Sequence, residues 1–210
     1  MIYKASRPIL SILLPLIFLG TLINGYQHVV ITGTAATVPG AQSPDTVFRF
    51  LALGDMGTGD DDQLAVAGAM TALHQNQPFD TVLLLGDNVY PDGDPADLRK
   101  KFERPYAEML KLGVNFYATL GNHDVRKGRN AQIDYPLFNM GGQAYYSFVK
   151  GDGLIEFFSL DSTDADQEQM HWLDVALAKS KARWKVAFFH HPIYSSGKNP
   201  WFRQAFAKTA

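Results

Sequence analysis

Oxygen and nitrogen donors follow four apolar runs of the sequence, each at the point where a strand is expected to end. Residues 50–53, 82–85 and 116–120 run into Gly-Asp or Gly-Asn, and residues 186–189 run into His-His-Pro. In open α/β sheets, ligands bind at the carboxyl ends of the strands. The side chains that this pattern brings to one edge are Asp55, Asp87, Tyr90, Asn122, His123 and His190. Because such donors suit hard or borderline cations, the pattern predicts a pair of metal ions there.

The specificity of this signal comes from its repetition. A single Gly-Asp after a strand is usually a turn, and a lone Asn-His or His-His pair is more often structural. Three such endings, followed by a fourth apolar run that ends in histidine, are far more specific. We expect the glycines before Asp55, Asp87 and Asn122 to let the chain turn sharply and to leave room beside a metal or substrate.

The elements that must position these residues alternate along the chain as in an α/β domain. One helix is expected to begin at residues 60–62, a second to open at Asp94 and break at Pro105, and a third to span residues 166–179. Residues 126–142 show no sustained period and are predicted to form a long loop. The predicted strands are residues 47–53, 81–85, 114–120, 144–149, 154–160 and 184–189.

Composition narrows the class of protein. The 210 residues are 46% hydrophobic, which is typical of a globular chain with a real core. Lys and Arg number 19 against 21 Asp and Glu, so no basic face is indicated and we expect no nucleic-acid partner. The absence of cysteine excludes disulfides and thiolate zinc sites. Any metal must therefore be held by oxygen and nitrogen.

The amino-terminal segment has the composition of a leader. Lys4 and Arg7 precede an apolar stretch over residues 8–23, and no acidic residue occurs before Asp45. Residues 1–24 are therefore predicted to be a signal peptide or a membrane anchor, residues 25–45 a linker, and residues 46–210 the folded domain. The domain is expected to be exported to the periplasm or the extracellular space. An uncleaved leader would attach it to the membrane through residues 8–23.

The motifs resemble those of the calcineurin-like metallophosphoesterases, and within them the purple acid phosphatases. Most members of the family have a histidine two residues after the first aspartate. Here that position is Gly57, and Tyr90 follows the second aspartate by three residues, as in the purple subgroup. The resemblance implies an α/β fold with a two-sheet β sandwich flanked by helices. The motifs that carry it are Gly54-Asp55-Met56-Gly57, Gly86-Asp87-Asn88-Val89-Tyr90, Gly121-Asn122-His123-Asp124 and the run from Val186 to Pro192.

The same resemblance implies a ligand set for a binuclear metal centre. Asp55 and Tyr90 would bind the first metal, and Asp87 would bridge both metals. Asn122 and His190 would bind the second. Tyrosinate implies Fe(III) in the first site, with Fe(II), Zn or Mn in the second.

The resemblance also implies an activity, the hydrolysis of phosphate monoesters by a metal-bound hydroxide. A small phosphorylated molecule would be the substrate. His123 would contact the phosphate and help to protonate the leaving alcohol.

Two residues near these motifs allow more than one interpretation. His191 competes with His190 for the metal, and the family register favours the histidine two residues before Pro192, which is His190. Asp161 follows another apolar run, and a structural role in a turn is favoured over a supporting role at the site.

One family motif, Gly-His-x-His, is expected after His190 and does not occur in the sequence. The resemblance therefore implies a domain that is truncated at its carboxyl end and that lacks one histidine ligand for each metal. Two functional classes follow. One is an exported binuclear metallophosphatase, and the other is a non-catalytic, metal-poor remnant of such an enzyme.

Overall fold

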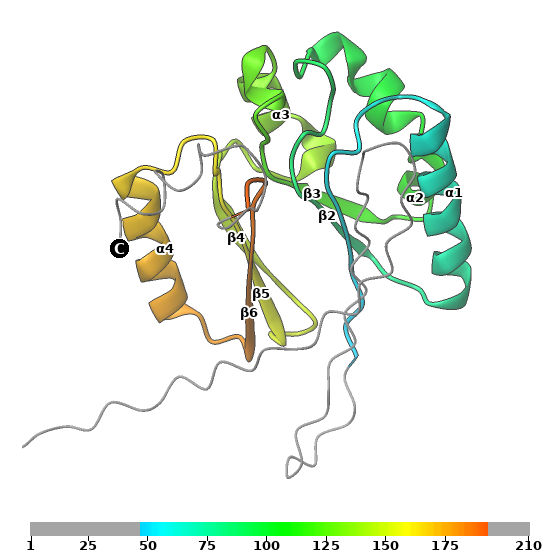
Figure 1. Ribbon diagram of the computed structural model, residues 1–210. Helices are drawn as coiled ribbons and strands as arrows, with labels where there is room; N and C mark the ends of the chain where they lie inside the picture. Colours follow the sequence, from blue (N-terminus) through cyan, green and yellow to red (C-terminus); the bar gives the residue numbers. More distant parts are fainter. Residues whose placement is uncertain (1–46, 193–210) are drawn as a thin grey trace, which may run out of the picture.

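The computed structural model describes residues 47–192, which form two three-stranded sheets with helices on the outside (Figure 1). The predicted leader and linker, residues 1–24 and 25–45, lie outside the described residues. Within residues 47–192, no helix combines the length and the apolar character needed to cross a membrane.

The first sheet is parallel, with its strands in the order β1-β2-β3. The helix after β1 begins where its sequence predicts, because the Asp60 side chain accepts the Gln63 N–H and caps the first turn. The predicted break at Pro105 is also present, since a π-helix ends just before it and a short α-helix begins after it. The elements are β1 (Leu51–Leu53), α1 (Asp61–Asn76), β2 (Thr81–Leu84), the 3-10 helix η1 (Pro95–Asp97), the π-helix η2 (Arg99–Glu103), α2 (Ala107–Lys111) and β3 (Asn115–Ala118).

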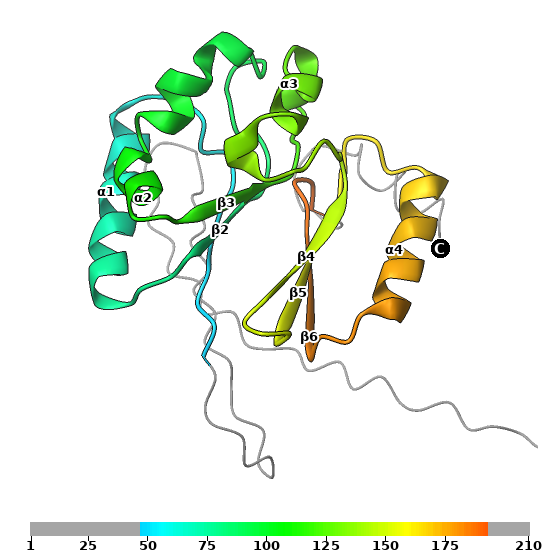
Figure 2. The same cartoon turned by 180° about the vertical axis from the view of Figure 1, so that it is seen from behind.

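The second sheet has the order β4-β5-β6 and is mixed. Strands β4 (Tyr146–Lys150) and β5 (Ile155–Ser159) are antiparallel, and β6 (Trp184–Phe188) runs parallel to β5. A parallel pair needs a crossover, which α4 (Gln167–Lys179) supplies. Figure 2 shows α4 outside this sheet, on the side away from α1 and α2. All six predicted strands are thus confirmed, each shorter than its apolar run.

The predicted loop over residues 126–142 is wrong in part, because this segment contains short helices. Two lie within it, α3 (Arg129–Ile133) and η4 (Pro136–Phe138), and a third, η3 (Asp124–Arg126), ends at its first residue. Phe138 is fully buried and contacts the ring of Phe102, far away in the sequence. These helices depend on such tertiary contacts and are too short to produce a helical period in the sequence.

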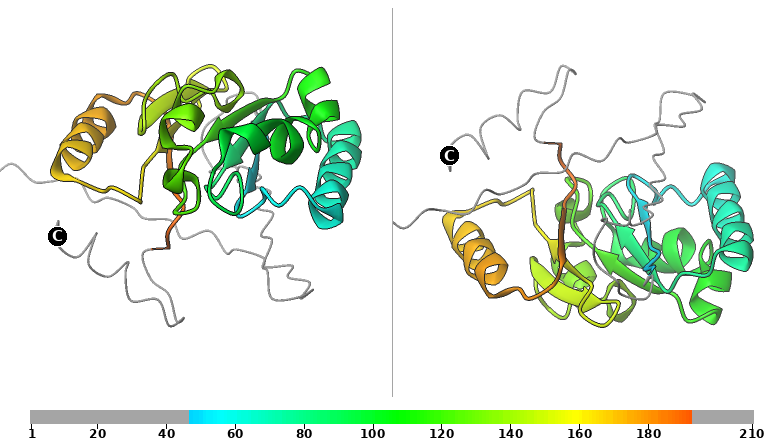
Figure 3. Two further views of the ribbon diagram at one scale, coloured as in Figure 1. Left: turned by 90° about the horizontal axis from the view of Figure 1, so that it is seen from above. Right: turned by 90° about the horizontal axis from the view of Figure 1, so that it is seen from below.

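The strands of the first sheet bury both of their faces. Leu51 and Leu53 point into a core shared with the helices, while Ala52 between them points into a core shared with the second sheet. Hydrogen bonds also join the sheets, because Tyr146 Oη and Ser159 Oγ both donate to the carbonyl of Ala118. Seen from above and below, the layers run from α4 through the two sheets to α1 (Figure 3). The predicted fold, a two-sheet sandwich flanked by helices, is confirmed.

The helix-side core predicts a large cost for losing one aromatic ring. Phe102 is fully buried and contacts the rings of Tyr106, Phe116 and Phe138. Because Phe102→Ala leaves a cavity among them, we expect it to lower the free energy of unfolding by about 3–5 kcal/mol in urea titrations of the full chain. Leu112→Ala, at a side chain that is 52% exposed, should change it by less than about 0.5 kcal/mol. Equal effects of the two substitutions would contradict this core.

Candidate metal centre

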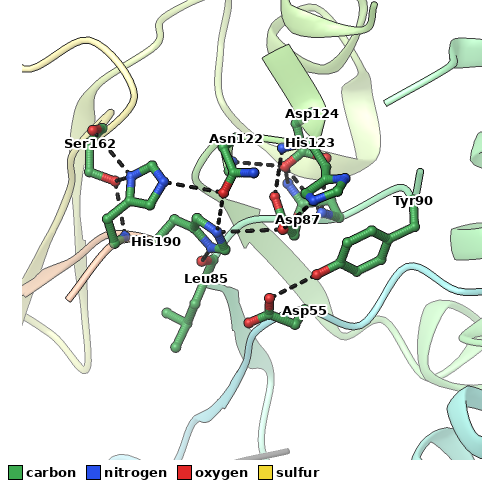
Figure 4. Close-up of polar contacts among 12 residues, drawn as sticks. Asp55, Leu85, Asp87, Tyr90, Asn122, His123, Asp124, Ser162 and His190 are labelled. Carbon is green, nitrogen blue, oxygen red and sulfur yellow. Dashed lines mark hydrogen bonds and ion pairs between the residues drawn. The ribbon is translucent and has the colours of Figure 1, made fainter. Parts of the chain in front are cut away.

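Four strand ends meet at one edge of the molecule and bring the predicted residues together (Figure 4). Asp55 follows β1, Asp87 follows β2, Asn122 follows β3 and His190 follows β6. Pairing continues past the first two strands, since the Asp55 N–H donates to Gly86 O over 3.1 Å. The loops after β1 and β2 are therefore fixed to each other.

Three side chains from these loops converge. One ligand atom each of Asp55, Asp87 and His190 lies within 4.8 Å of the other two. His190 Nε2 is 3.5 Å from Asp87 Oδ2 and 3.3 Å from Asn122 Oδ1. His190 Nδ1 lies 2.9 Å from the carbonyl oxygen of Leu85, so it carries the proton of the neutral ring and leaves the Nε2 lone pair facing the oxygens. Several electron-rich atoms that face one another fit a cation.

Tyr90 completes this cluster from the side of Asp55. Its hydroxyl donates to Asp55 Oδ1 over 2.8 Å. Partial burial, and then the hydrogen bond and charge of Asp55, raise the pKa of Tyr90 far above its ordinary value. The phenol therefore keeps its proton next to the carboxylates alone, and a highly charged cation is needed to favour tyrosinate.

His123 lies at the rim of the same cluster. Its backbone N–H donates to Asp87 Oδ1 over 2.9 Å, and its ring packs edge-on against Tyr90 with the centroids 4.6 Å apart. The ring Nδ1 is 2.5 Å from the carbonyl oxygen of Pro91 and so carries the proton. The other nitrogen, Nε2, lies 3.9 Å from Asp87 Oδ2 and is the atom available for chemistry.

The two aspartates adopt backbone conformations that L-residues rarely use. Asp55 has φ 55° and Asp87 has φ 53°, each at a cost of about 1 kcal/mol or more. The prediction that the preceding glycines make the turns holds only at Gly86, with φ 88°; Gly54 does not have positive φ. Gly121 has the other predicted role, because a Cβ there would overlap the Asp87 carboxylate. The chain thus accepts local strain to aim both carboxylates at one point.

A buried carboxylate that the sequence analysis did not single out holds two of these loops in place. Asp124 is 0% exposed and accepts the N–H groups of Asn88, Val89 and Gly121, over 2.8–3.1 Å, together with the Gln132 amide at 2.9 Å. Burial raises the pKa of Asp124, and these donors oppose that rise. Asn88 and Asp124 belong to the recognised motifs, whereas nothing in the sequence pattern indicated Gln132.

His191 takes a different position from its neighbour. Its Nε2 is 3.2 Å from Asn122 Oδ1, and its Nδ1 is 2.9 Å from Ser162 Oγ, on the loop after β5. Burial, and then the nearby His190, lower the pKa of His191 to about 4, so the ring is neutral at neutral pH. The group formed with Asp55 and Asp87 contains His190 and not His191.

Asp161 has structural contacts of the kind that the sequence favoured. Its Oδ1 accepts the N–H and the hydroxyl of Thr163 within its own turn, and its Oδ2 pairs with Arg129 over 2.6 Å. These bonds fix the loop after β5.

The fold is therefore a two-sheet α/β sandwich, and carboxylate, phenol, amide and imidazole groups that could hold a metal converge at its strand ends. A family model described as calcineurin-like phosphoesterase matches residues 48–209. The chain belongs to this family.

Its relatives include purple acid phosphatases of Arabidopsis thaliana. Purple acid phosphatase 7 is 28% identical over 191 residues, which cover 77% of this chain and 58% of the relative. The chain spans little more than half the length of the curated relatives that it matches.

Two solved structures share the fold. One is GAP50, the anchor in the inner membrane complex of Plasmodium, with a TM-score of 0.55 and 24% identity, covering 71% of this chain and 56% of that one. The other is a dimetal phosphatase from Danio rerio, with a TM-score of 0.54 and 14% identity, covering 77% of this chain and 76% of that one.

The Asp124 network leads to a prediction about stability. Asp124→Asn replaces one acceptor oxygen by an NH₂ group that faces N–H donors. We therefore expect the free energy of unfolding to fall by about 3 kcal/mol in urea titrations. The matched control is Asp174→Asn on the exposed face of α4, which should leave unfolding unchanged. A wild-type unfolding curve for Asp124→Asn would show that this carboxylate does not support the loops.

Proposed function

We propose that this domain supplies the metal-binding core of a purple acid phosphatase-like enzyme that hydrolyses phosphate monoesters. The observation that carries the proposal is the convergence of Asp55, Asp87 and His190, with Tyr90 bonded to Asp55. A phenol beside two carboxylates at strand ends is the donor set that suits a trivalent iron. Membership of the phosphoesterase family supports the same conclusion.

In this proposal the five donors divide between two cations. Asp55 and Tyr90 would hold Fe(III), Asn122 and His190 would hold Fe(II), Zn or Mn, and Asp87, with two carboxylate oxygens, would serve both. When bound there, such a pair of cations would supply an activated water molecule, orientation of the phosphate and neutralisation of its charge. The Asn122 amide adds a ligand oxygen without adding negative charge, which keeps the site attractive to a phosphate anion.

In this proposal, the residues around the metal donors orient the substrate and deliver a proton to its leaving group. His123 Nε2 faces the leaving alcohol and, once the ring has taken up a second proton at that atom, passes it to the leaving oxygen. The Tyr90 ring and the Pro91 carbonyl fix the orientation of this imidazole, so that Nε2 stays at the rim. A small phosphorylated molecule is the substrate class, and the leader over residues 1–24 would carry the domain out of the cell.

The second candidate is a non-catalytic domain. It is favoured by the likeness in fold to a protein that is described as an anchor. In that case the donor cluster would be a remnant that binds metal weakly or not at all.

The role of Tyr90 is testable by colour. The iron-loaded full chain should absorb visible light through charge transfer from tyrosinate to Fe(III), and Tyr90→Phe should lose this band. The Tyr135→Phe variant is the control, because Tyr135 bonds to Glu103 away from the cluster and its loss should leave the band intact. A band that persists in Tyr90→Phe would assign the colour to another ligand.

Substitutions at Asp87 and at His123 should distinguish loss of metal binding from loss of proton transfer. Asp87→Ala removes a donor common to both cations, so elemental analysis should show loss of metal and hydrolysis of 4-nitrophenyl phosphate should fall to background. His123→Asn should keep the metal and slow hydrolysis by about 100-fold or more. If the metal-loaded wild-type chain fails to hydrolyse this ester, the non-catalytic alternative stands.

A further inference from the structure

Arg126 lies directly beside the reactive nitrogen of His123. Its Nη2 is 3.4 Å from His123 Nε2, and its Nη1 donates to the carbonyl oxygen of Pro91 over 3.2 Å. The same carbonyl oxygen contacts His123 Nδ1. One backbone acceptor, on the loop after β2, therefore positions both the guanidinium and the imidazole. Since Nδ1 carries the ring proton, Nε2 is the acceptor of the Arg126 N–H.

The positive charge of Arg126 is not balanced by a bonded carboxylate. On the same segment, Lys127 pairs with Asp92 over 2.6 Å and Arg129 pairs with Asp161 over 2.6 Å. Among residues 47–192, the partners found for Arg126 are the Pro91 carbonyl and the ring of His123. Asp87 also approaches this imidazole, since its Oδ2 lies 3.9 Å from His123 Nε2.

This arrangement leaves donors free at a defined place. A guanidinium has five N–H groups, of which two are used here. In the proposed function, the leaving oxygen of the substrate meets His123 Nε2. A negative group a few bonds from that oxygen would then reach the Arg126 fork, which matches carboxylate and phosphate in geometry and charge.

We propose that Arg126 is a specificity-determining residue that selects phosphate monoesters whose leaving group carries a second anion, a carboxylate or a phosphate, close to the ester oxygen. This inference rests on the proposed function and deepens it. Lysine would supply the charge without the fork, and glutamine would supply donors without the charge. The alternative is that Arg126 binds the transferred phosphate, in which case it would strengthen the binding of all substrates equally.

The test is calorimetric binding of two phosphonates that are not hydrolysed, phosphonoacetate and its amide carbamoylmethylphosphonate, to the metal-loaded full chain. The two ligands have nearly the same shape and differ in one negative charge. We expect phosphonoacetate to bind about five- to tenfold more tightly than the amide. Arg126→Gln should abolish this preference and change the Kd of the amide by less than twofold. Arg126→Lys should restore part of it.

Lys127→Gln is the matched control, because Lys127 is the next residue and is already paired with Asp92. It should keep the preference. If Arg126→Gln keeps the preference, the carboxylate does not meet Arg126 and the inference fails. If Arg126→Gln weakens both phosphonates and inorganic phosphate equally, Arg126 binds the transferred phosphate and the inference also fails.

Two further measurements on the same samples distinguish a failure of the Arg126 inference from a failure of the proposed function. Inorganic phosphate binding and hydrolysis of 4-nitrophenyl phosphate report on the proposed function alone. If both are present and wild type shows no preference between the phosphonates, only the role of Arg126 is overturned. If neither is present, the proposed function fails, and the specificity inference fails with it.

Discussion

The candidate metal centre depends on the hydrogen bonds of one buried carboxylate, that of Asp124. It receives N–H groups from the loop after β2 and from the loop after β3, and these loops carry Asp87 and Asn122. Gln132 on α3 supplies another donor, which connects the short helices after β3 to the same point. A carboxylate in an apolar interior is stabilised only when its lone pairs are satisfied, and here they are satisfied by groups whose position matters for the site. The packing of the sandwich and the geometry of the cluster are linked through this one side chain.

The residues of the cluster adopt conformations and contacts that are locally unfavourable. Asp55 and Asp87 both adopt left-handed backbone conformations, and their carboxylates lie together with the lone pair of His190. The Tyr90 hydroxyl keeps its proton in this setting because burial and the neighbouring carboxylates disfavour the phenolate. Strained residues and like charges at one point are stable only if the surrounding structure enforces them, and such features concentrate at functional sites. A cation would relieve the repulsion and lower the pKa of the phenol at the same time.

Much of the fold could be predicted from the sequence because its strands are continuous apolar runs with polar residues at their ends. The Asp60 cap and the Pro105 break were also predictable, because each acts through local chemistry. The short helices between residues 126 and 142 were not, because Gln132 and Phe138 are fixed by partners far away in the sequence.

At the site, the spacing of the motifs was enough to predict that Asp55, Asp87 and His190 lie at one edge of the sheets. It could not show that the aspartates, and not the residue Gly54, would adopt positive φ. Nor could it reveal that Pro91 O holds both His123 and Arg126, because a backbone acceptor leaves no signature in residue types.

In the proposed site, two cations would be held together by Asp55, Asp87, Tyr90, Asn122 and His190. Anomalous diffraction from crystals of the full chain grown with iron and zinc, recorded at both absorption edges, tests this most directly. We expect two neighbouring peaks that flank the Asp87 carboxylate, with the iron peak on the side of Tyr90. The absence of any peak among these five side chains would contradict it.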